Sequence, residues 1–368
     1  MENFKIARSE IKDAVEAVKS LKEQLSGIDA GMVLYFVSTS YPVETICREM
    51  ADAFAEAQTV GCTTAGEMIT GSMGVKSIVA MAFGKDTLKY LKVEVLENIQ
   101  TDTECVAKAF KSFETSLGKR MKTLDPERYV GMVLFDGLSR CEEAINDMMG
   151  NLTNVPFVGG TAGDDLTFKG TYQFHNGRVY TDAAILLLME PTNGYAILKT
   201  QSAELTDIRL TPTKVNEKRR AVNEFDGKPA AVAYAEALGV SVDDLPKYFA
   251  ERPVGLVFDE KNIFIRSPQE ILEDGSVTFG SAIKEGLELN VVQATDIVAG
   301  TVNALQNACD AKAIVDFNCA YRFVELTAKN QLQAYSEIFG NVPTIGFSTY
   351  GESYIGHMNQ TSTMLLLK

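Results

Sequence analysis

Three stretches of the chain spell nearly the same phrase: Thr59-Val-Gly-Cys-Thr-Thr-Ala-Gly-Glu67, Phe157-Val-Gly-Gly-Thr-Ala-Gly-Asp164 and Thr344-Ile-Gly-Phe-Ser-Thr-Tyr-Gly-Glu352. Each phrase leads through a glycine and a Ser/Thr cluster to a second glycine and an acid. A helix-like stretch precedes each phrase, and apolar runs of strand length flank it, at residues 33–36, 133–135 and 314–315 upstream and 77–83, 183–189 and 362–367 downstream. This recurring strand–helix–strand–glycine–strand unit predicts an α/β (α+β mixed) fold of layered mixed sheets, built from repeated β-α-β-β units in two packed halves.

The remaining elements are predicted from hydrophobic periodicity and turn residues. Apolar residues at helical spacing predict an amphipathic opening helix over residues 4–25. Further helices are expected at residues 40–57, 102–117, 141–149, 213–224, 229–238 and 294–308. Strand pairs are expected at residues 77–83 with 87–95, at 172–174 with 179–188 across Asn176-Gly177, at 254–258 with 263–265 across residues 259–262, and around Asp274-Gly275.

Length and composition indicate a globular protein of about two domains. The chain has 368 residues, of which 46% are hydrophobic and 23% charged, so its core needs no disulfide or metal. Its apolar runs are of strand length, and residues 1–25 carry charges throughout instead of a secretory apolar core. We therefore expect a cytoplasmic protein without membrane insertion.

The charge balance argues against one class of partner. The formal net charge of -14 opposes binding to nucleic acid, which requires basic residues to neutralise phosphates. The basic cluster from Lys214 to Arg220 is short and contains a glutamate, and we expect it on the solvated face of a helix.

Cysteine and histidine usage gives no sign of a metal centre. None of the six cysteines has the spacing of a metal site, which favours reduced thiols: Cys47, Cys62, Cys105, Cys141, Cys309 and Cys319. The two histidines, His175 and His357, are too few for a His-rich site, and no HExxH, CxxCH or P-loop motif occurs. No metal or cofactor is expected on these grounds.

The glycine turns are where we place ligand binding. Glycine at a strand end permits a positive φ and close backbone approach, and exposed N–H groups there can hold an anion. Nearby hydroxyls and acids would complete a complement to a zwitterion such as a free amino acid. The alternative is a set of tight turns whose hydroxyls satisfy local N–H groups. The candidate residues are Thr63, Thr64, Gly66, Glu67, Thr161, Gly163, Asp164, Asp165, Ser348, Thr349, Gly351 and Glu352.

Three further candidates follow predicted strands. Asp136 follows a buried strand, at the end where loops often bind ligands, or it is a polar strand terminus. Arg322 could clamp a carboxylate through two nitrogens, or lie on the surface. Cys319 could be a nucleophile, although its strand context favours a buried, inert thiol.

In their order along the chain, these motifs resemble the FIST family, a bacterial and archaeal sensory module that pairs a FIST-N with a FIST-C domain. The matching stretches are residues 60–67, 156–165, 225–230, 319–322, 346–352 and 359–361. The resemblance covers about residues 30–367. It implies a FIST-N-like domain (30–212) and a FIST-C-like domain (213–368), which follow the N-terminal amphipathic helix (1–30) expected from hydrophobic spacing.

The resemblance implies a sensor of a small ligand in signal transduction, with amino acids or their derivatives as the ligand class of the family. The chain leaves no room for a kinase, cyclase or chemotaxis output domain. The expected partner is therefore a separate signalling protein, such as a kinase or a chemotaxis-type receptor.

Two alternatives remain open. An enzyme could use a carboxylate pair drawn from Glu67, Asp164, Asp165 and Glu352 for acid–base work, with Cys319 or Thr64 as nucleophile. Some relatives of the resembled family are associated with haem and nitric-oxide sensing, and here such a sensor would have to use His175 or His357 as ligand to haem.

Overall fold

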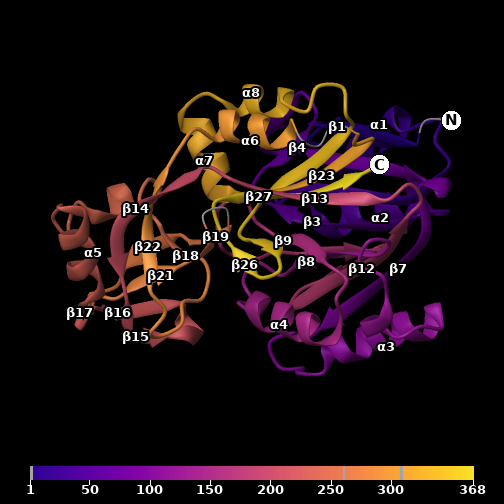
Figure 1. The fold of residues 1–368 in the computed structure, drawn as a ribbon. Helices are drawn as coiled ribbons and strands as arrows, with labels where there is room; N and C mark the ends of the chain where they lie inside the picture. The colour runs from indigo at the N-terminus through magenta and orange to yellow at the C-terminus, as the bar shows by residue number, and fades with distance from the viewer. Residues whose placement is uncertain (1–2, 260–261, 307–309) are drawn as a thin grey trace.

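A computed structural model describes residues 3–259, 262–306 and 310–368. The described chain forms three six-stranded sheets and a smaller lobe with two sheets of its own (Figure 1). The predicted mixed α/β class is confirmed. Among the described residues, no helix combines the length and apolar character needed to cross a bilayer.

The chain runs through the same series of elements three times, and we call each series a repeat. The first repeat consists of β1 (Phe4–Ser9), α1 (Ala14–Gln24), β2 (Ala30–Ser38), α2 (Val43–Ala53), β3 (Gln58–Thr64), β4 (Glu67–Ile69), β5 (Ser72–Gly74) and β6 (Ile78–Gly84). The second consists of β7 (Leu88–Glu97), α3 (Cys105–Leu117), β8 (Val130–Phe135), α4 (Glu142–Leu152), β9 (Phe157–Thr161), β10 (Gln173–His175), β11 (Arg178–Tyr180) and β12 (Ala183–Pro191). The third consists of β13 (Tyr195–Gln201), α6 (Ile297–Leu305), β23 (Ala313–Cys319), α7 (Ala320–Ala328), α8 (Leu332–Glu337), β24 (Thr344–Thr349), β25 (Glu352–Tyr354), β26 (His357–Met358) and β27 (Thr361–Leu367).

Each repeat completes its sheet with a hairpin taken from another repeat. The sheet orders are β1-β6-β2-β3-β10-β11, β7-β12-β8-β9-β25-β26 and β13-β27-β23-β24-β4-β5. Hairpin β10–β11 therefore joins the first sheet, β25–β26 the second, and β4–β5 the third. The central strands pair in parallel because a helix connects them, and the other pairs are antiparallel. This cyclic exchange ties the three repeats into one body.

The inner faces of the three sheets share one apolar core, and helices cover their outer faces. Phe36, Phe317 and Phe347 from two of the sheets meet in this core, with Phe36 and Phe347 ring centroids 4.5 Å apart. Outside, α1 and α2 cover the first sheet, α3 and α4 the second, and α6, α7 and α8 the third. The central strands are thus buried on both faces, which explains their continuous apolar sequences.

The first glycine of each phrase is required by close approach between parallel strands. A Cβ added at Gly61, Gly159 or Gly346 would lie 2.0, 1.8 or 2.6 Å from a carbonyl oxygen of the neighbouring strand. None of the glycines in the phrases has a positive φ. Of the two backbone features that glycine permits, these positions therefore use close approach and not a positive φ.

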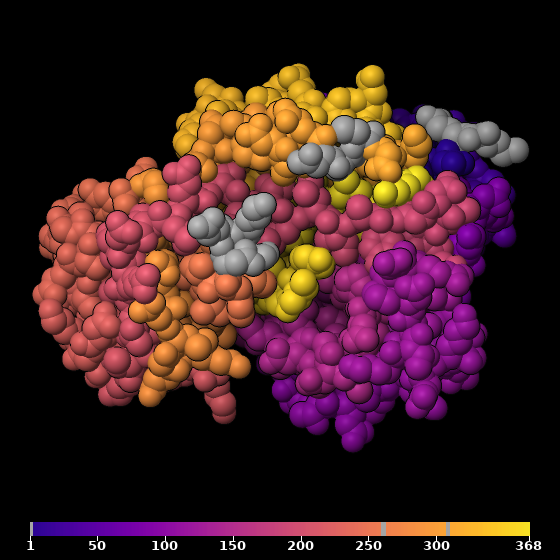
Figure 2. All heavy atoms as spheres, in the orientation of Figure 1, coloured from indigo at the N-terminus to yellow at the C-terminus, as the bar shows by residue number. Residues whose placement is uncertain are grey.

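A smaller domain, residues 203–294, interrupts the third repeat between β13 and α6, and we call it the inserted domain. Its elements are β14 (Ala203–Leu210), β15 (Pro212–Asn216), β16 (Ala221–Phe225), β17 (Lys228–Pro229), α5 (Ala230–Leu238), β18 (Val254–Asp259), β19 (Asn262–Arg266), β20 (Pro268–Ile271), β21 (Val277–Phe279) and β22 (Leu289–Ala294). It forms a separate lobe against the body (Figure 2). The two connections lie side by side, since the Thr295 N–H donates to the Ser202 carbonyl at 2.8 Å.

Several predicted elements need correction. Residues 4–9 form strand β1 at the edge of a sheet, and the opening helix begins only after Asp13, whose carboxylate caps it. Residues 213–224 contain the paired strands β15 and β16 instead of a helix, because tertiary pairing overrides a polar local sequence. Strands β6 and β7 are consecutive but lie in different sheets, so the predicted strand pair is wrong.

Other local predictions are confirmed. Helix α5 and the hairpins β10–β11, β18–β19 and β20–β21 lie at the positions predicted from the sequence. Residues 260–261 of one predicted turn, the end of the predicted helix at Ala308, and Cys309 lie outside the described residues.

Candidate ligand site at the junction of the inserted domain

The three glycine turns meet at one end of the body and bind one another. The Gly163 N–H donates to the Thr63 carbonyl at 3.0 Å, which joins the second turn to the first. The Ser348 N–H donates to the Gly66 carbonyl at 2.7 Å, which joins the third turn to the first. The Thr161 N–H donates to the Gly351 carbonyl at 2.9 Å, which joins the second turn to the third. The three turns thus converge, and their backbone groups bond to each other.

Side chains of the turns are buried in this junction, and most of those named here bond to groups of the protein itself. The Thr349 hydroxyl donates to the Thr161 carbonyl at 2.8 Å, and the Thr63 hydroxyl accepts from the Tyr172 N–H at 3.0 Å. The Thr64 hydroxyl donates to the Glu67 carboxyl. The Ser348 hydroxyl is buried and has no hydrogen-bond partner among the described residues.

Two buried glutamates tie the first and third turns to the strands that follow them. Glu67 accepts from the Ser77 N–H and hydroxyl at 3.0 and 2.8 Å, and Glu352 accepts from the corresponding groups of Thr361 at 3.0 and 2.7 Å. Burial raises the pKa of Glu67 to about 7 and that of Glu352 to about 8, against the opposing effect of these donors. Near neutral pH, Glu352 is therefore mostly a neutral acid.

Asp164 and Asp165, which follow β9 in the second repeat, accept hydrogen bonds from groups in nearby loops. The Asp164 carboxylate accepts from the N–H groups of Phe168, Lys169 and Gly170. Against the effect of burial, the Tyr350 hydroxyl and the N–H groups of Gly170 and Lys169 lower the Asp164 pKa. The Asp165 carboxylate accepts from the hydroxyls of Ser38 and Thr39.

Asp136, which follows β8, also accepts hydrogen bonds from neighbouring loops. Its Oδ1 accepts from the Thr171 hydroxyl at 2.7 Å, and its Oδ2 accepts from the Asp182 N–H at 2.6 Å. The carboxylate oxygens of Asp164 and Asp136 thus already accept hydrogen bonds from donors of the protein itself.

An open hollow of about 330 Å³ lies near one of these loops. It contains Asp164 and the start of α2, and its wall comprises Thr39, Tyr41, Pro42, Val43, Glu44, Asp164, Thr167, Lys169, Gly170 and Tyr172. The Asp164 carboxylate binds the N–H groups of its own loop, so its oxygens are not available to a ligand in this hollow.

Arg322 is a predicted candidate that combines a buried positive charge with an unused donor. It lies on α7, one turn after β23, and is 2% exposed. Its Nε donates to Asn318 Oδ1 at 2.8 Å and one Nη donates to the Thr301 hydroxyl at 2.9 Å. Its Nη1 is buried and has no hydrogen-bond partner among the described residues. Both bonded oxygens are neutral, so the described residues leave this buried cation without an ion pair.

Nearby acids do not supply the missing partner. Asp316 gives its two oxygens to Ser362 and Tyr335 instead of bonding to Arg322. Burial raises the Asp316 pKa to about 6, against the opposing effects of Ser362, the charge of Arg322 and Tyr335. Glu352 Oε1 is buried without a hydrogen-bond partner in the described chain. Burial raises the Glu352 pKa, and the charge of Arg322 lowers it by a smaller amount. Burial also raises the pKa of the Cys319 thiol, which fits the buried, inert cysteine expected from its strand context.

Arg322 faces a small cavity at the junction with the inserted domain. The cavity has a volume of about 10 Å³, room for about one water molecule. Its wall comes from both parts of the protein: Ser202, Ala250, Ala294, Ile297, Tyr321, Arg322, Glu325 and Gln360. Within the described ranges, the hydroxyl of Ser202 and Nε2 of Gln360 are also buried without partners.

Sequence reasoning missed most of this wall because it is assembled from distant segments. Tyr321 and Gln360 lie inside the stretches 319–322 and 359–361, which carry part of the family resemblance. That resemblance is the sequence signal that could have identified these two residues. Ser202 and Ala250 carry no local signal, since their role follows from where the inserted domain packs.

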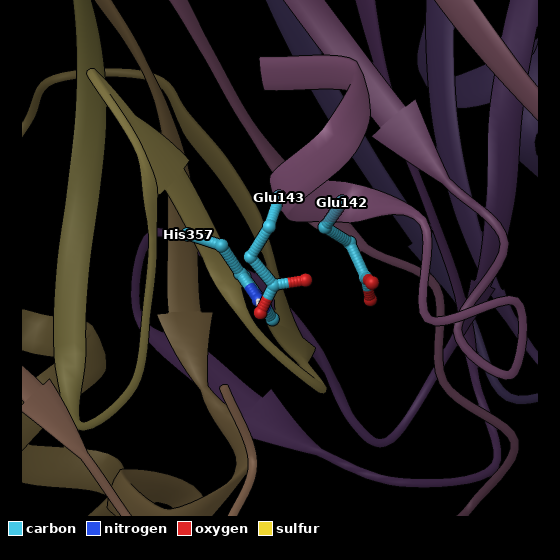
Figure 3. Close-up of side chains that lie close together, drawn as sticks. All are labelled: Glu142, Glu143 and His357. Atoms are coloured by element: carbon cyan, nitrogen blue, oxygen red, sulfur yellow. Dashed lines mark hydrogen bonds and ion pairs between the residues drawn. The ribbon is translucent and has the colours of Figure 1, made fainter. Parts of the chain in front are cut away.

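A second polar cluster lies at the same junction, where α4 meets the inserted domain. Glu142 and Glu143 lie at the start of α4, and Glu143 extends toward His357 of hairpin β25–β26 (Figure 3). Arg220 donates to Glu142 Oε2 at 2.5 Å and to Glu143 Oε2 at 2.6 Å, and His357 Nδ1 lies 3.1 Å from Glu143 Oε1. Arg220 thus supplies the positive charge that a metal ion would otherwise bring to these carboxylates.

This cluster corrects the prediction for Lys214–Arg220. The stretch lies on the β15–β16 hairpin, and the Arg220 side chain is 10% exposed instead of lying on a solvated helix face. Burial alone would raise the pKa of Glu143, but His357 and Arg220 outweigh it and hold that pKa below its usual range.

The histidines do not fit a haem. A Cβ at Gly351 would lie 1.9 Å from His357 Nε2, so that nitrogen packs against backbone, while Nδ1 faces Glu143. His175 Nε2 lies 3.1 Å from Gln58 Oε1, and burial lowers its pKa. Neither contact presents Nε2 to an iron atom.

Comparison with known proteins gives matches over most of the chain. Residues 31–228 match the FIST N domain and residues 230–354 match the FIST C domain. A relative from Methanocaldococcus jannaschii, "Uncharacterized protein MJ1623", is 26% identical over 325 residues. The match covers 82% of this chain and 62% of the relative, so the chain spans less than two thirds of that protein.

Proposed function

Because the chain belongs to the FIST family of sensory domains, we propose that it senses a small ligand with a carboxylate group, such as an amino acid, at Arg322. The observation that carries this proposal is the buried Arg322 guanidinium, which bonds to neutral oxygens and keeps Nη1 free of the described residues. A buried cation without a hydrogen-bonded anion is costly, and a ligand carboxylate would offset that cost.

The other groups around the cavity suit the rest of an amino acid. Ser202 and Gln360 have polar atoms left unbonded by the described chain next to the carboxylate position. Glu325, which also lines the cavity and pairs with Lys329 at 2.7 Å, would attract the ligand's ammonium group. The glycine turns then act mainly as the rigid support that holds β23, β24 and Glu352 behind Arg322.

Ligand binding at this position would necessarily move the inserted domain. An amino acid is larger than the single water that the closed cavity accommodates, and Ala250 and Ala294 of the inserted domain form part of its wall. Binding therefore favours a state in which the inserted domain has moved about its paired connections at Ser202 and Thr295. A separate signalling protein in the cytoplasm, of the kinase or chemotaxis-receptor type, would respond to that movement.

The test is a thermal-shift and calorimetric screen with the twenty protein amino acids and their amides. We expect at least one amino acid to bind, its amide to bind much more weakly, and Arg322→Gln to weaken binding by about 30-fold or more, as for loss of a buried charged partner. The exposed Arg178→Gln serves as the matched control. Equal binding of acid and amide, or undiminished binding by a folded Arg322→Gln variant, would contradict the proposal.

A further inference from the structure

The cluster at α4 lies across the same junction as the Arg322 cavity but at another point. In Figure 1 the inserted domain joins the body near α6 and α7, while α4 lies lower in the view. Arg220 comes from the inserted domain, and Glu142 and Glu143 come from the body. The ion pairs therefore bridge two parts of the protein whose connections are at Ser202 and Thr295.

The contacts across this cluster are directional, and Glu142 is buried, while the side chains of Arg220 and Glu143 are 10% and 27% exposed. Besides its two glutamate partners, Arg220 donates from Nη1 to the Gly280 carbonyl at 2.9 Å, which fixes the guanidinium within the inserted domain. Glu143 Oε1 accepts from the Ala282 N–H at 2.7 Å, a backbone contact across the junction. Glu142 is 1% exposed, so its charge has little access to water if Arg220 leaves.

One short segment connects the cluster to the cavity. The His357 carbonyl accepts from Arg266 Nη1 at 3.0 Å, and the Asn359 N–H donates to the Ile265 carbonyl at 3.2 Å. Asn359 Oδ1 also accepts from the Ser281 hydroxyl at 2.9 Å. The next residue, Gln360, lines the Arg322 cavity. Residues 357–360 thus touch the inserted domain from the ion-pair cluster to the ligand position.

We propose that Arg220, Glu142 and Glu143 form a latch that holds the inserted domain closed over Arg322 and so sets the threshold for ligand binding. This inference rests on the proposed function, because it concerns regulation of the same site. The closed cavity is too small for an amino acid, so ligand must bind a state in which the latch is strained or open. The apparent affinity is reduced by the fraction of molecules that remain closed.

The proposal predicts that breaking the latch tightens ligand binding, although Arg220 and Glu143 are not among the residues lining the cavity. We expect Arg220→Gln and Glu143→Gln each to increase affinity at least about tenfold, because a broken buried ion pair no longer favours the closed state. The double variant should add little to Arg220→Gln alone, since Arg220→Gln already removes the Arg220–Glu143 contact as well as the Arg220–Glu142 contact. Arg209→Gln, which removes an exposed ion pair with Glu288 in the inserted domain, is the control and should leave affinity unchanged.

Two measurements separate this proposal from the proposed function. Hydrogen exchange of the Ala282 and Asn359 amides, without ligand, should accelerate in Arg220→Gln and Glu143→Gln but not in Arg209→Gln; unchanged exchange in both latch variants would overturn the latch. Binding is measured with an equimolar mixture of the twenty protein amino acids. If the wild-type protein binds but the latch variants do not bind more tightly, the proposal that the latch sets the threshold for ligand binding is wrong. If the mixture binds to none of the proteins, the proposed function fails while the exchange result still decides the latch.

Discussion

Gly159→Ala is expected to abolish stable folding or to lower the melting temperature sharply. The added Cβ would lie 1.8 Å from the Val133 carbonyl oxygen, in the parallel pair of β8 and β9. Neither strand can move aside, because both are buried between the shared core and the helices α3 and α4. Ordinary overpacking costs about 1–3 kcal/mol, and a collision with backbone at this distance should exceed that range.

A matched control is available in the neighbouring helix. Gly150 lies in α4, where an added Cβ meets no atom within 4 Å, so Gly150→Ala should stabilise the protein by about 0.5–1 kcal/mol. The measurement is the soluble yield and thermal unfolding of the two variants beside the wild-type protein. A Gly159→Ala protein with the wild-type melting temperature would show that the close strand approach is not essential.

Glu352→Gln is expected to make the protein more resistant to alkaline pH. Burial raises the pKa of Glu352 from 4.5 to about 8, so the folded state holds a proton that the unfolded state releases near pH 4.5. Its contribution to stability is complete below about pH 4.5 and is lost as pH rises through about 8. With about 1.4 kcal/mol per pKa unit, the pH-dependent difference amounts to several kcal/mol.

The measurement is the melting temperature of wild-type and Glu352→Gln proteins between pH 5 and pH 9. Because glutamine cannot ionise, the variant should gain stability relative to the wild type as pH rises, with most of the gain complete shortly above pH 8. The exposed Glu204→Gln serves as the comparison and should follow the wild-type profile. A constant difference between wild type and Glu352→Gln across this range would show that Glu352 does not titrate near pH 8 in the folded protein.

The repeated architecture could be predicted from the sequence because the glycine phrases and apolar runs are local patterns. Gly61, Gly159 and Gly346 mark equivalent points of three parallel strand pairs, and the flanking runs mark the buried strands. The exchange of hairpins among repeats could not be predicted in this way. Nothing within residues 67–74 indicates that β4 pairs with β24 of the third repeat, since that pairing depends on packing of the whole body.

The candidate site could be predicted only in part, again because local patterns reveal single residues but not long-range contacts. The place of Arg322 after a strand suggests a carboxylate clamp, and the structure has a buried guanidinium there, with one nitrogen left unbonded by the described residues. The role of the turns as a mutually bonded junction depends on contacts such as Thr161 with Thr349, 188 residues apart. The sequence places Arg220 on a solvated face because its neighbours Lys218 and Arg219 are indeed exposed, and its burial follows from docking of the inserted domain.

The most direct test of the central claim is a crystal structure of the protein with the tightest-binding amino acid from the screen. We predict that the ligand carboxylate lies within hydrogen-bond distance of Arg322 Nη1, in a cavity enlarged by displacement of the inserted domain. A ligand bound elsewhere, with Arg322 still enclosed at the domain junction, would contradict it.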